Sequence, residues 1–189
     1  MHDDDLGRCL LAVARHAIAC ELALFVPLPQ TGGLQRLGAT FVTLLCGGEL
    51  RGCIGSLNAR RALEVDVREN ALAAAFRDPR FPPLSVGEFP ALSIEVSLLS
   101  QPEAVSFATE GELLSRLVPG VDGVALDIED RRATFLPQVW ETIPEPREFL
   151  AALKAKARIP AGFWSPQLNV SLYRVTKWKE SEMEREAAS

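Results

Sequence analysis

Residues 41–56, FVTLLCGGELRGCIGS, constrain the fold of this chain most, because they have the pattern of a β-hairpin. Two runs of strand-forming residues flank Gly47 and Gly48, and a Gly-Gly pair supplies the positive φ angles that a tight two-residue turn needs. The pattern predicts two antiparallel strands, and we expect the rest of the fold to be organised around them.

The return strand of this hairpin carries the residues that point to chemistry. Side chains two apart on a strand share a face, so we expect Arg51 and Cys53 to lie on the same side. Gly52 then faces the opposite side and Gly55 the same side, and neither has a side chain. A glycine weakens a strand and usually marks the close approach of another backbone or of a ligand. Arg51 and Cys53 are therefore candidate catalytic residues, and Gly52 and Gly55 are candidate binding residues.

The rest of the chain mixes helical and strand patterns, which predicts an α+β fold. Apolar residues at three-to-four spacing predict helices over residues 5–24, 62–76, 110–118 and 146–157. Alternation predicts strands over residues 92–99 and 170–178, and a second hairpin over residues 123–128 and 132–136. The charged tail from residue 179 is expected to fray. We expect a mixed, largely antiparallel sheet with packed helices, in a single domain spanning residues 1–189.

Four further polar residues are candidates for binding. Asn70 lies on the apolar stripe of helix 62–76, whose many alanines imply close packing against a sheet; it is either a satisfied buried amide or a site residue. Asp78 and Arg80 lie in the rigid turn DPRFPP, either as a local surface ion pair or as site residues. Glu95 lies on the polar face of strand 92–99, either exposed to solvent or in the site.

The net charge of −5 argues against general binding to nucleic acid, because such binding depends on many Lys and Arg side chains that neutralise phosphates. No apolar run approaches the roughly 18 residues of a transmembrane helix. The first residues, MHDDD, are acidic, whereas a secretory signal begins with positive charge. The sequence therefore predicts a cytoplasmic protein that binds neither nucleic acid nor a membrane.

The four cysteines do not form a disulfide framework, because they are few and no C-x-x-C occurs. A turn at residues 47–48 places Cys53 opposite Val42, about four residues along the ladder from Cys46, too far for a bridge. Two histidines without ligand-like spacing argue against a metal site. Cys20 and His16, with Cys9, lie on the first helix and are expected to pack in or beside the core.

Cys53 has two interpretations, a nucleophile or a small packing residue. A nucleophile must be a thiolate, which Arg51 on the same face favours. A histidine base is available only from His2 or His16, so a papain-like pair with Cys53 is not expected. Asp78 or Glu95 then has to transfer the proton. Neither a phosphate-binding loop nor a dinucleotide fingerprint is present, so the sequence leaves the cofactor unknown.

The segment Leu50–Gly55, LRGCIG, resembles the signature of the AMMECR domain family, whose bacterial and archaeal members are labelled AmmeMemoRadiSam system protein A. The resemblance continues over nearly the whole chain, through AAAF at 73–76, DPRF at 78–81, IEVS at 94–97, ATFLPQV at 133–139, EFL at 148–150 and KA at 156–157. One departure is Arg158-Ile159, where the family often has Gly-Leu. Gln138, within the segment ATFLPQV, joins the candidate binding residues.

The resemblance implies one α+β domain with a larger and a smaller lobe, and a cleft near the LRGCIG strand. It implies association with a Memo-like protein and a radical S-adenosylmethionine protein, but not a particular reaction. This chain lacks the C-x3-C-x2-C motif of a radical enzyme, so it is not expected to carry the iron–sulfur cluster.

Two hypotheses of function follow. In the first, the chain is an enzyme or an accessory component of a modification pathway, with Cys53 and Arg51 in its cleft. In the second, the same residues form a binding or adaptor module that docks a partner without turnover. Both predict that Arg51, Cys53, Asp78, Arg80 and Glu95 converge on one site.

Overall fold

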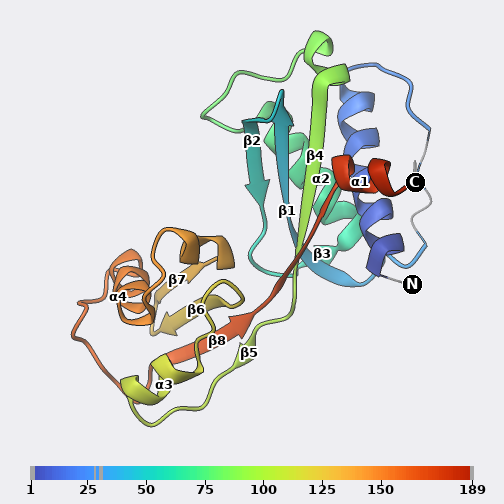
Figure 1. Cartoon of the computed structure of the whole chain (residues 1–189). Helices are drawn as coiled ribbons and strands as arrows, with labels where there is room; N and C mark the ends of the chain where they lie inside the picture. The colour runs from blue at the N-terminus through green and yellow to red at the C-terminus, as the bar shows by residue number, and fades with distance from the viewer. Residues whose placement is uncertain (1–2, 28, 30–31, 188–189) are drawn as a thin grey trace. The chain divides into compact units, whose positions relative to one another are not determined.

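The computed structural model describes residues 3–27, 29 and 32–187 (Figure 1). The helices are α1 (Asp3–Glu21), α2 (Leu63–Phe76), α3 (Glu110–Arg116), α4 (Pro146–Lys156) and α5 (Glu180–Ala187), with 3-10 helices η1 (Val86–Ala91) and η2 (Pro137–Glu141). The strands are β1 (Leu37–Cys46), β2 (Glu49–Gly55), β3 (Arg61–Ala62), β4 (Leu92–Leu99), β5 (Glu103–Ala104), β6 (Gly123–Ile128), β7 (Arg131–Phe135), β8 (Asn169–Tyr173) and β9 (Val175–Lys179). Among the described residues, no helix is long and apolar enough to cross a membrane.

The chain divides into two compact units, each with its own sheet. Met1–Leu99 and Thr176–Ser189 form the first unit, and Ser100–Val175 form the second. The first sheet has the strand order β2-β1-β4-β9, with β3 paired to β1, and the second has the order β5-β8-β6-β7. β1 pairs antiparallel with β2, β3 and β4, and β6 pairs antiparallel with β7 and β8. The predicted α+β fold class is confirmed.

The predicted hairpin is present as β1 and β2, joined by Gly47 and Gly48, which both have positive φ. Its register differs from the expected one beyond the turn. A β-bulge shifts the pairing between Leu44 and Leu45, so Cys53 lies opposite Thr43 and not opposite Val42. The predicted pairing of Cys53 was therefore wrong by one residue, because a bulge adds one residue to β2 at Arg51.

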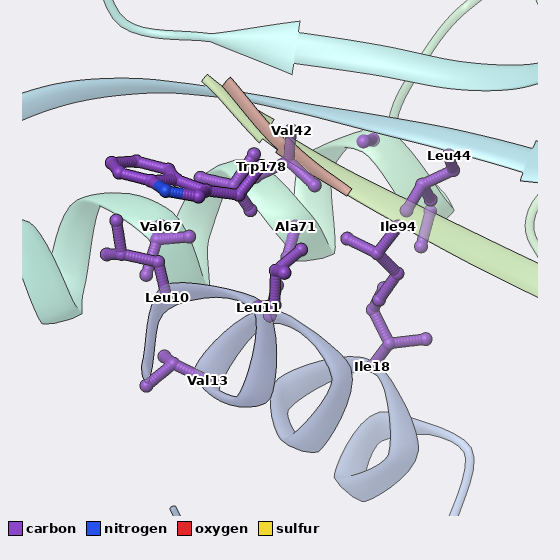
Figure 2. Close-up of a cluster of buried hydrophobic side chains, with 14 of the residues drawn as sticks. Leu10, Leu11, Val13, Ile18, Val42, Leu44, Val67, Ala71, Ile94 and Trp178 are labelled. Atoms are coloured by element: carbon purple, nitrogen blue, oxygen red, sulfur yellow. The ribbon is translucent and has the colours of Figure 1, made fainter. Parts of the chain in front are cut away.

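The core of the first unit lies between one face of its sheet and the helices α1 and α2. Figure 2 shows side chains of α1, such as Leu10 and Ile18, directed toward side chains of the strands, such as Val42 and Ile94. We call this covered side the inner face. Because side chains alternate along a strand, Thr43 and its neighbours two residues away lie on the opposite side, the outer face.

α2 lies unusually close to β2, as its alanine-rich stripe predicts. A Cβ atom added to Gly52 would lie less than 3.0 Å from the backbone carbonyl oxygen of Ala74 in α2. Gly52 is buried, and Ala71, Ala74 and Ala75 are buried in the same core. The expectation that a glycine in this strand marks the close approach of another backbone is therefore confirmed for Gly52.

The second unit packs α3 and α4 with β6, β7 and β8 around a separate core. The rings of Trp140 and Phe149 stack with their centroids 3.6 Å apart. Lys154 in α4 is almost fully buried, and its ammonium donates to the Glu110 carboxylate at 2.6 Å and to the carbonyls of Ala161 and Phe163. These contacts connect α4 with the first residue of α3.

Two predictions for the C-terminal part of the chain were wrong. The expected strand 170–178 is two strands, β8 in the second sheet and β9 in the first, separated at Arg174. The tail from residue 179 was expected to fray, but over residues 180–187 it forms helix α5. Glu180 accepts two hydrogen bonds from the Arg15 guanidinium, each 2.6 Å long, and one from the backbone N–H of Ile94. These bonds hold the start of α5 against α1 and β4.

Candidate functional site

Cys53 lies on the free edge of the first sheet, because β2 is the end strand. Its backbone N–H donates to Asp78 Oδ2 at 2.9 Å, and its carbonyl accepts from Arg80 Nη2 at 3.3 Å. Asp78 and Arg80 also pair with each other, at 2.7 Å. Unpaired edge groups invite aggregation or strand addition. The Asp78–Arg80 pair satisfies them here and fixes the backbone that presents the thiol.

Asp78 is nearly fully buried, whereas the Arg80 side chain is about half exposed. Hydrogen bonds from the Arg80 side chain, opposed in part by burial and supported by the backbone N–H of Cys53, hold the pKa of Asp78 well below its usual range. The pair is therefore not the weak surface interaction that the sequence pattern left open. It is an ion pair that joins residues 78–80 to the backbone of β2 through hydrogen bonds.

Arg51 has a carboxylate partner of its own. Its Nε donates to Glu88 Oε1 at 2.7 Å, and its Nη2 donates to the Pro83 carbonyl at 3.4 Å. Ser85 and Glu88 form a capping box at the start of η1. The hydrogen bond from Arg51, with those from Ser85, lowers the pKa of Glu88 to about 2. The remaining nitrogen, Arg51 Nη1, is buried and has no hydrogen-bond partner among the residues that the structure describes.

The Cys53 thiol accepts a hydrogen bond from the hydroxyl of Thr43 at 3.3 Å. Thr43 also lies opposite Glu95 on β4, and Glu95 pairs with Lys177 of β9 at 3.4 Å. Cys53, Thr43 and Glu95 are all half-buried. The outer face of the first sheet thus carries one row of a thiol, a hydroxyl, a carboxylate and an ammonium, which we call the polar row.

The structure brings several of the predicted residues together, with a different pairing from the expected one. Cys53, Asp78 and Arg80 contact one another directly, and the hydrogen bond with Asp78 raises the pKa of Arg80. Arg51 joins them through Phe81, because both guanidinium groups lie within 6 Å of that ring's centroid. Glu95 joins through Thr43.

Two predicted binding residues lie elsewhere, and a third, Gly55, lies on β2 two residues from Cys53. Gln138 is exposed in η2 of the second unit. Gly55 lies opposite Phe41, and a Cβ atom there would meet the Phe41 ring. Asn70 is a satisfied buried amide, the first of the two alternatives that its position on the helix allowed: its Nδ2 donates to the Thr40 carbonyl at 2.9 Å and to Asp66 Oδ2 at 3.0 Å.

Sequence reasoning missed the buried carboxylate beside Asn70. Asp66 accepts the backbone N–H and the hydroxyl of Thr40 at Oδ2, and the hydroxyl of Ser56 and the guanidinium of Arg61 at Oδ1. A signal for it was present, because Asp66 is one turn before Asn70 on the apolar stripe of α2. Glu88 could have been found from the capping-box spacing S-x-x-E. Thr43 could be placed beside Cys53 only with the correct register.

Among residues 3–27, 29 and 32–187, no group of three or more His, Cys, Asp or Glu side chains is placed to hold a metal ion. The four cysteines are free thiols, of which Cys20 is exposed and the other three are half-buried. Cys9 packs beside the core of the first unit, as expected.

Comparison with known proteins identifies the family. A model of the AMMECR1 family matches residues 11–178, most of the chain. The chain belongs to the AMMECR1 family. A relative from Methanothermobacter thermautotrophicus is 33% identical over 186 residues, which cover 93% of this chain and 95% of the relative. A relative from Thermotoga maritima is 37% identical over 147 residues, which cover 77% of this chain and 79% of the relative.

A solved structure shares the fold of this AMMECR1-family chain. It is that of the uncharacterized protein PH0010 from Pyrococcus horikoshii, with a TM-score of 0.76 and 28% sequence identity over 93% of this chain and 92% of the other. Its name assigns no reaction. The function of the present chain therefore has to be inferred from its own residues.

The low pKa of Glu88 predicts how stability changes with pH. The folded-state pKa of about 2 lies below the ordinary value of 4.5, so the bonds of ionised Glu88 stabilise the fold above about pH 4.5. This contribution is lost as the pH falls from 4.5 toward 2. We expect Glu88→Gln to be less stable than wild type at pH 6, with a difference that shrinks by pH 3, as measured by urea denaturation.

Glu49→Gln is the matched control, because Glu49 is an exposed carboxylate on β2, the strand that carries Arg51. It should follow the wild-type curve at each pH. A constant gap between wild type and Glu88→Gln from pH 6 to pH 3 would contradict the role given to the Arg51–Glu88 pair.

Proposed function

We propose that this AMMECR1-family protein is a cytosolic accessory component of a modification pathway, and that it holds its substrate in a cleft at the polar row. The observation that carries the proposal is that the polar side chains around β2 fall into two groups, those in ion pairs beside the strand and those on the outer face. The charged groups of Arg51 and Asp78 are held by Glu88 and Arg80. Cys53, Thr43 and Glu95 instead line the outer face, where a ligand would meet a thiol, a hydroxyl and a carboxylate whose partner, Lys177, is exposed.

Binding is better supported than nucleophilic catalysis by Cys53. In the described part of the chain, the thiol hydrogen-bonds only with the Thr43 hydroxyl, which donates to it and is not a base. A thiol nucleophile needs a group that accepts its proton. His16 does not serve, because α1 covers the inner face and Cys53 lies on the outer face.

A second candidate function is an enzyme with Cys53 as its nucleophile. The observation in its favour is geometric: the Thr43 hydroxyl donates to the sulfur at 3.3 Å, and the guanidinium of Arg80 donates to the Cys53 carbonyl at 3.3 Å. Reactive cysteines in general lie beside cationic groups of this kind. In this case the substrate itself, or Glu95 through Thr43, receives the proton.

The partners that we propose are a Memo-like protein and a radical S-adenosylmethionine protein, on the strength of the family resemblance. We expect a purified Memo-like protein from the same organism to bind this chain, and Thr43→Val with Glu95→Gln to weaken binding about tenfold or more. Isothermal titration calorimetry measures the affinity. Glu49→Gln, which changes the same charge outside the polar row, is the control, and unchanged urea midpoints show that the variants fold.

Alkylation separates the two candidate functions. Cys46 and Cys53 are both half-buried thiols of one hairpin, so Cys46 is the internal reference. Binding without catalysis predicts that iodoacetamide modifies Cys53 no faster than Cys46 at neutral pH. A modification rate at Cys53 ten times that at Cys46, with no affinity for the Memo-like protein, would contradict the binding module and support the enzyme.

A further inference from the structure

A second thiol, on the opposite side of the first unit's sheet from Cys53, lies beside a histidine. Cys20 Sγ is 3.4 Å from Nε2 of His16, one turn earlier on α1. The other ring nitrogen, His16 Nδ1, is 3.0 Å from the carbonyl oxygen of Val26. A carbonyl can only accept, so Nδ1 carries the hydrogen and Nε2 presents its lone pair to the Cys20 thiol.

This arrangement has the three parts of an activated nucleophile. Cys20 supplies the sulfur, His16 supplies a proton acceptor within hydrogen-bond reach, and the Val26 carbonyl orients the acceptor. The sequence led us to expect Cys20 to pack in or beside the core. The structure instead leaves Cys20 exposed and His16 half-buried, so the sulfur is accessible to a reagent.

The pair lines a pocket between α1 and α2 with a volume of about 410 Å³. This is within the range of pockets that hold small molecules. Val13, Ala17 and Leu72 give the pocket an apolar wall beside the thiol. A small molecule seated there is therefore in contact with Cys20 and His16 and partly shielded from water.

The charges around the pocket select among small molecules. Three carboxylates line it, those of Glu21, Glu64 and Glu69, against one guanidinium, that of Arg68. Arg68 already pairs with Glu69 at 3.2 Å. The pocket therefore carries net negative charge, which concentrates cations and disfavours anions.

We propose that Cys20 is a nucleophilic thiol that undergoes thiol–disulfide exchange with small cationic disulfides. His16 Nε2 takes the proton of Cys20, and the sulfur attacks one sulfur of the disulfide. The disulfide bond of the reagent breaks as the Cys20 mixed disulfide forms, and the departing thiolate takes the proton from His16. Cys20 is oxidised, and half of the reagent is reduced to a free thiol. This site is independent of the polar row.

The test uses three disulfides of similar size: cystamine, which is cationic, 2-hydroxyethyl disulfide, which is neutral, and dithiodiglycolate, which is anionic. Peptide mapping by mass spectrometry gives the rate at each cysteine of the intact chain at neutral pH. After normalisation to N-acetylcysteine, we expect Cys20 to react with cystamine at least about tenfold faster than with dithiodiglycolate. It should also react at least about tenfold faster than Cys9 on the same helix.

Two variants assign the effects to residues. His16→Gln should slow the reaction of Cys20 with all three disulfides by about tenfold. Glu21→Gln with Glu64→Gln should reduce the preference for cystamine over dithiodiglycolate while leaving the rate with 2-hydroxyethyl disulfide unchanged. Equal normalised rates for cystamine and dithiodiglycolate on the wild-type chain would overturn the proposal. So would a Cys20 rate in the native chain no higher than in the urea-unfolded chain.

Discussion

A Gly52→Ala variant is expected to lose about 3 kcal/mol of its free energy of unfolding, in the upper part of the range for an overpacked core. The added methyl group would lie less than 3.0 Å from the Ala74 carbonyl oxygen. That oxygen belongs to the backbone of α2, so it cannot rotate away as a side chain can. Either α2 must move from β2 or the edge strand must move from β1. Urea denaturation followed by circular dichroism measures the loss.

Two other glycines of the first unit serve as controls. A Cβ atom at Gly87 has nothing within 4 Å, so Gly87→Ala should stay within about 0.5 kcal/mol of wild type. At Gly55 the methyl group meets the Phe41 ring, a side chain that can turn, so an intermediate loss is expected. If Gly52→Ala were as stable as Gly87→Ala, the close approach of α2 to β2 would not exist in solution.

Gly52 also shows which parts of the fold the sequence could predict. The Gly-Gly turn, the alternation of β4 and the alanine stripe of α2 are local patterns, and each predicted its element. The position of the bulge was not predictable in this way. It depends on how β2 pairs with β1 beyond the turn, which the local pattern of residues does not show. One added residue in β2 then changed the residue opposite Cys53 from Val42 to Thr43.

The sequence predicted which residues form the candidate site better than it predicted which of them contact one another. The sequence indicated Arg51, Cys53, Asp78 and Arg80, and the structure gathers all four around β2 and Phe81. It could not indicate that the guanidinium beside Cys53 is that of Arg80, because this depends on a contact across 27 residues. The division of residues 170–178 between two sheets was hidden for a similar reason: strand-forming residues lie on both sides of Arg174, and the sheet that each half joins depends on distant strands.

Removing the buried carboxylate of Asp66 should have the largest effect on stability. We expect Asp66→Ala to lose about 4 kcal/mol, because removing one partner of a buried charged network leaves the other groups without bonds. The Thr40 backbone N–H and the Asn70 amide are buried and both donate to Asp66 Oδ2. Arg61 is affected less, because its side chain is 41% exposed and water can solvate it.

An Asp66→Asn variant separates shape from hydrogen bonding. It keeps the volume of the side chain and one acceptor oxygen, but its amide nitrogen must face the donors at one of the two former oxygen positions. About half of the Asp66→Ala loss is therefore expected. Glu69→Ala, on the same helix, removes a carboxylate whose partners Arg68 and Arg77 are exposed, and should cost less than about 1 kcal/mol.

The order of the free energies of unfolding of these three variants, measured by urea denaturation, tests whether Asp66 holds α2 to β1. If Asp66→Ala were no less stable than Glu69→Ala, Asp66 would not be holding α2 to β1. The alanine-rich packing of α2 would then alone have to set the distance between the helix and the strand that carries Cys53. The predicted order instead means that one buried carboxylate fixes the start of α2, and that α2 fixes the inner side of β2 through Gly52.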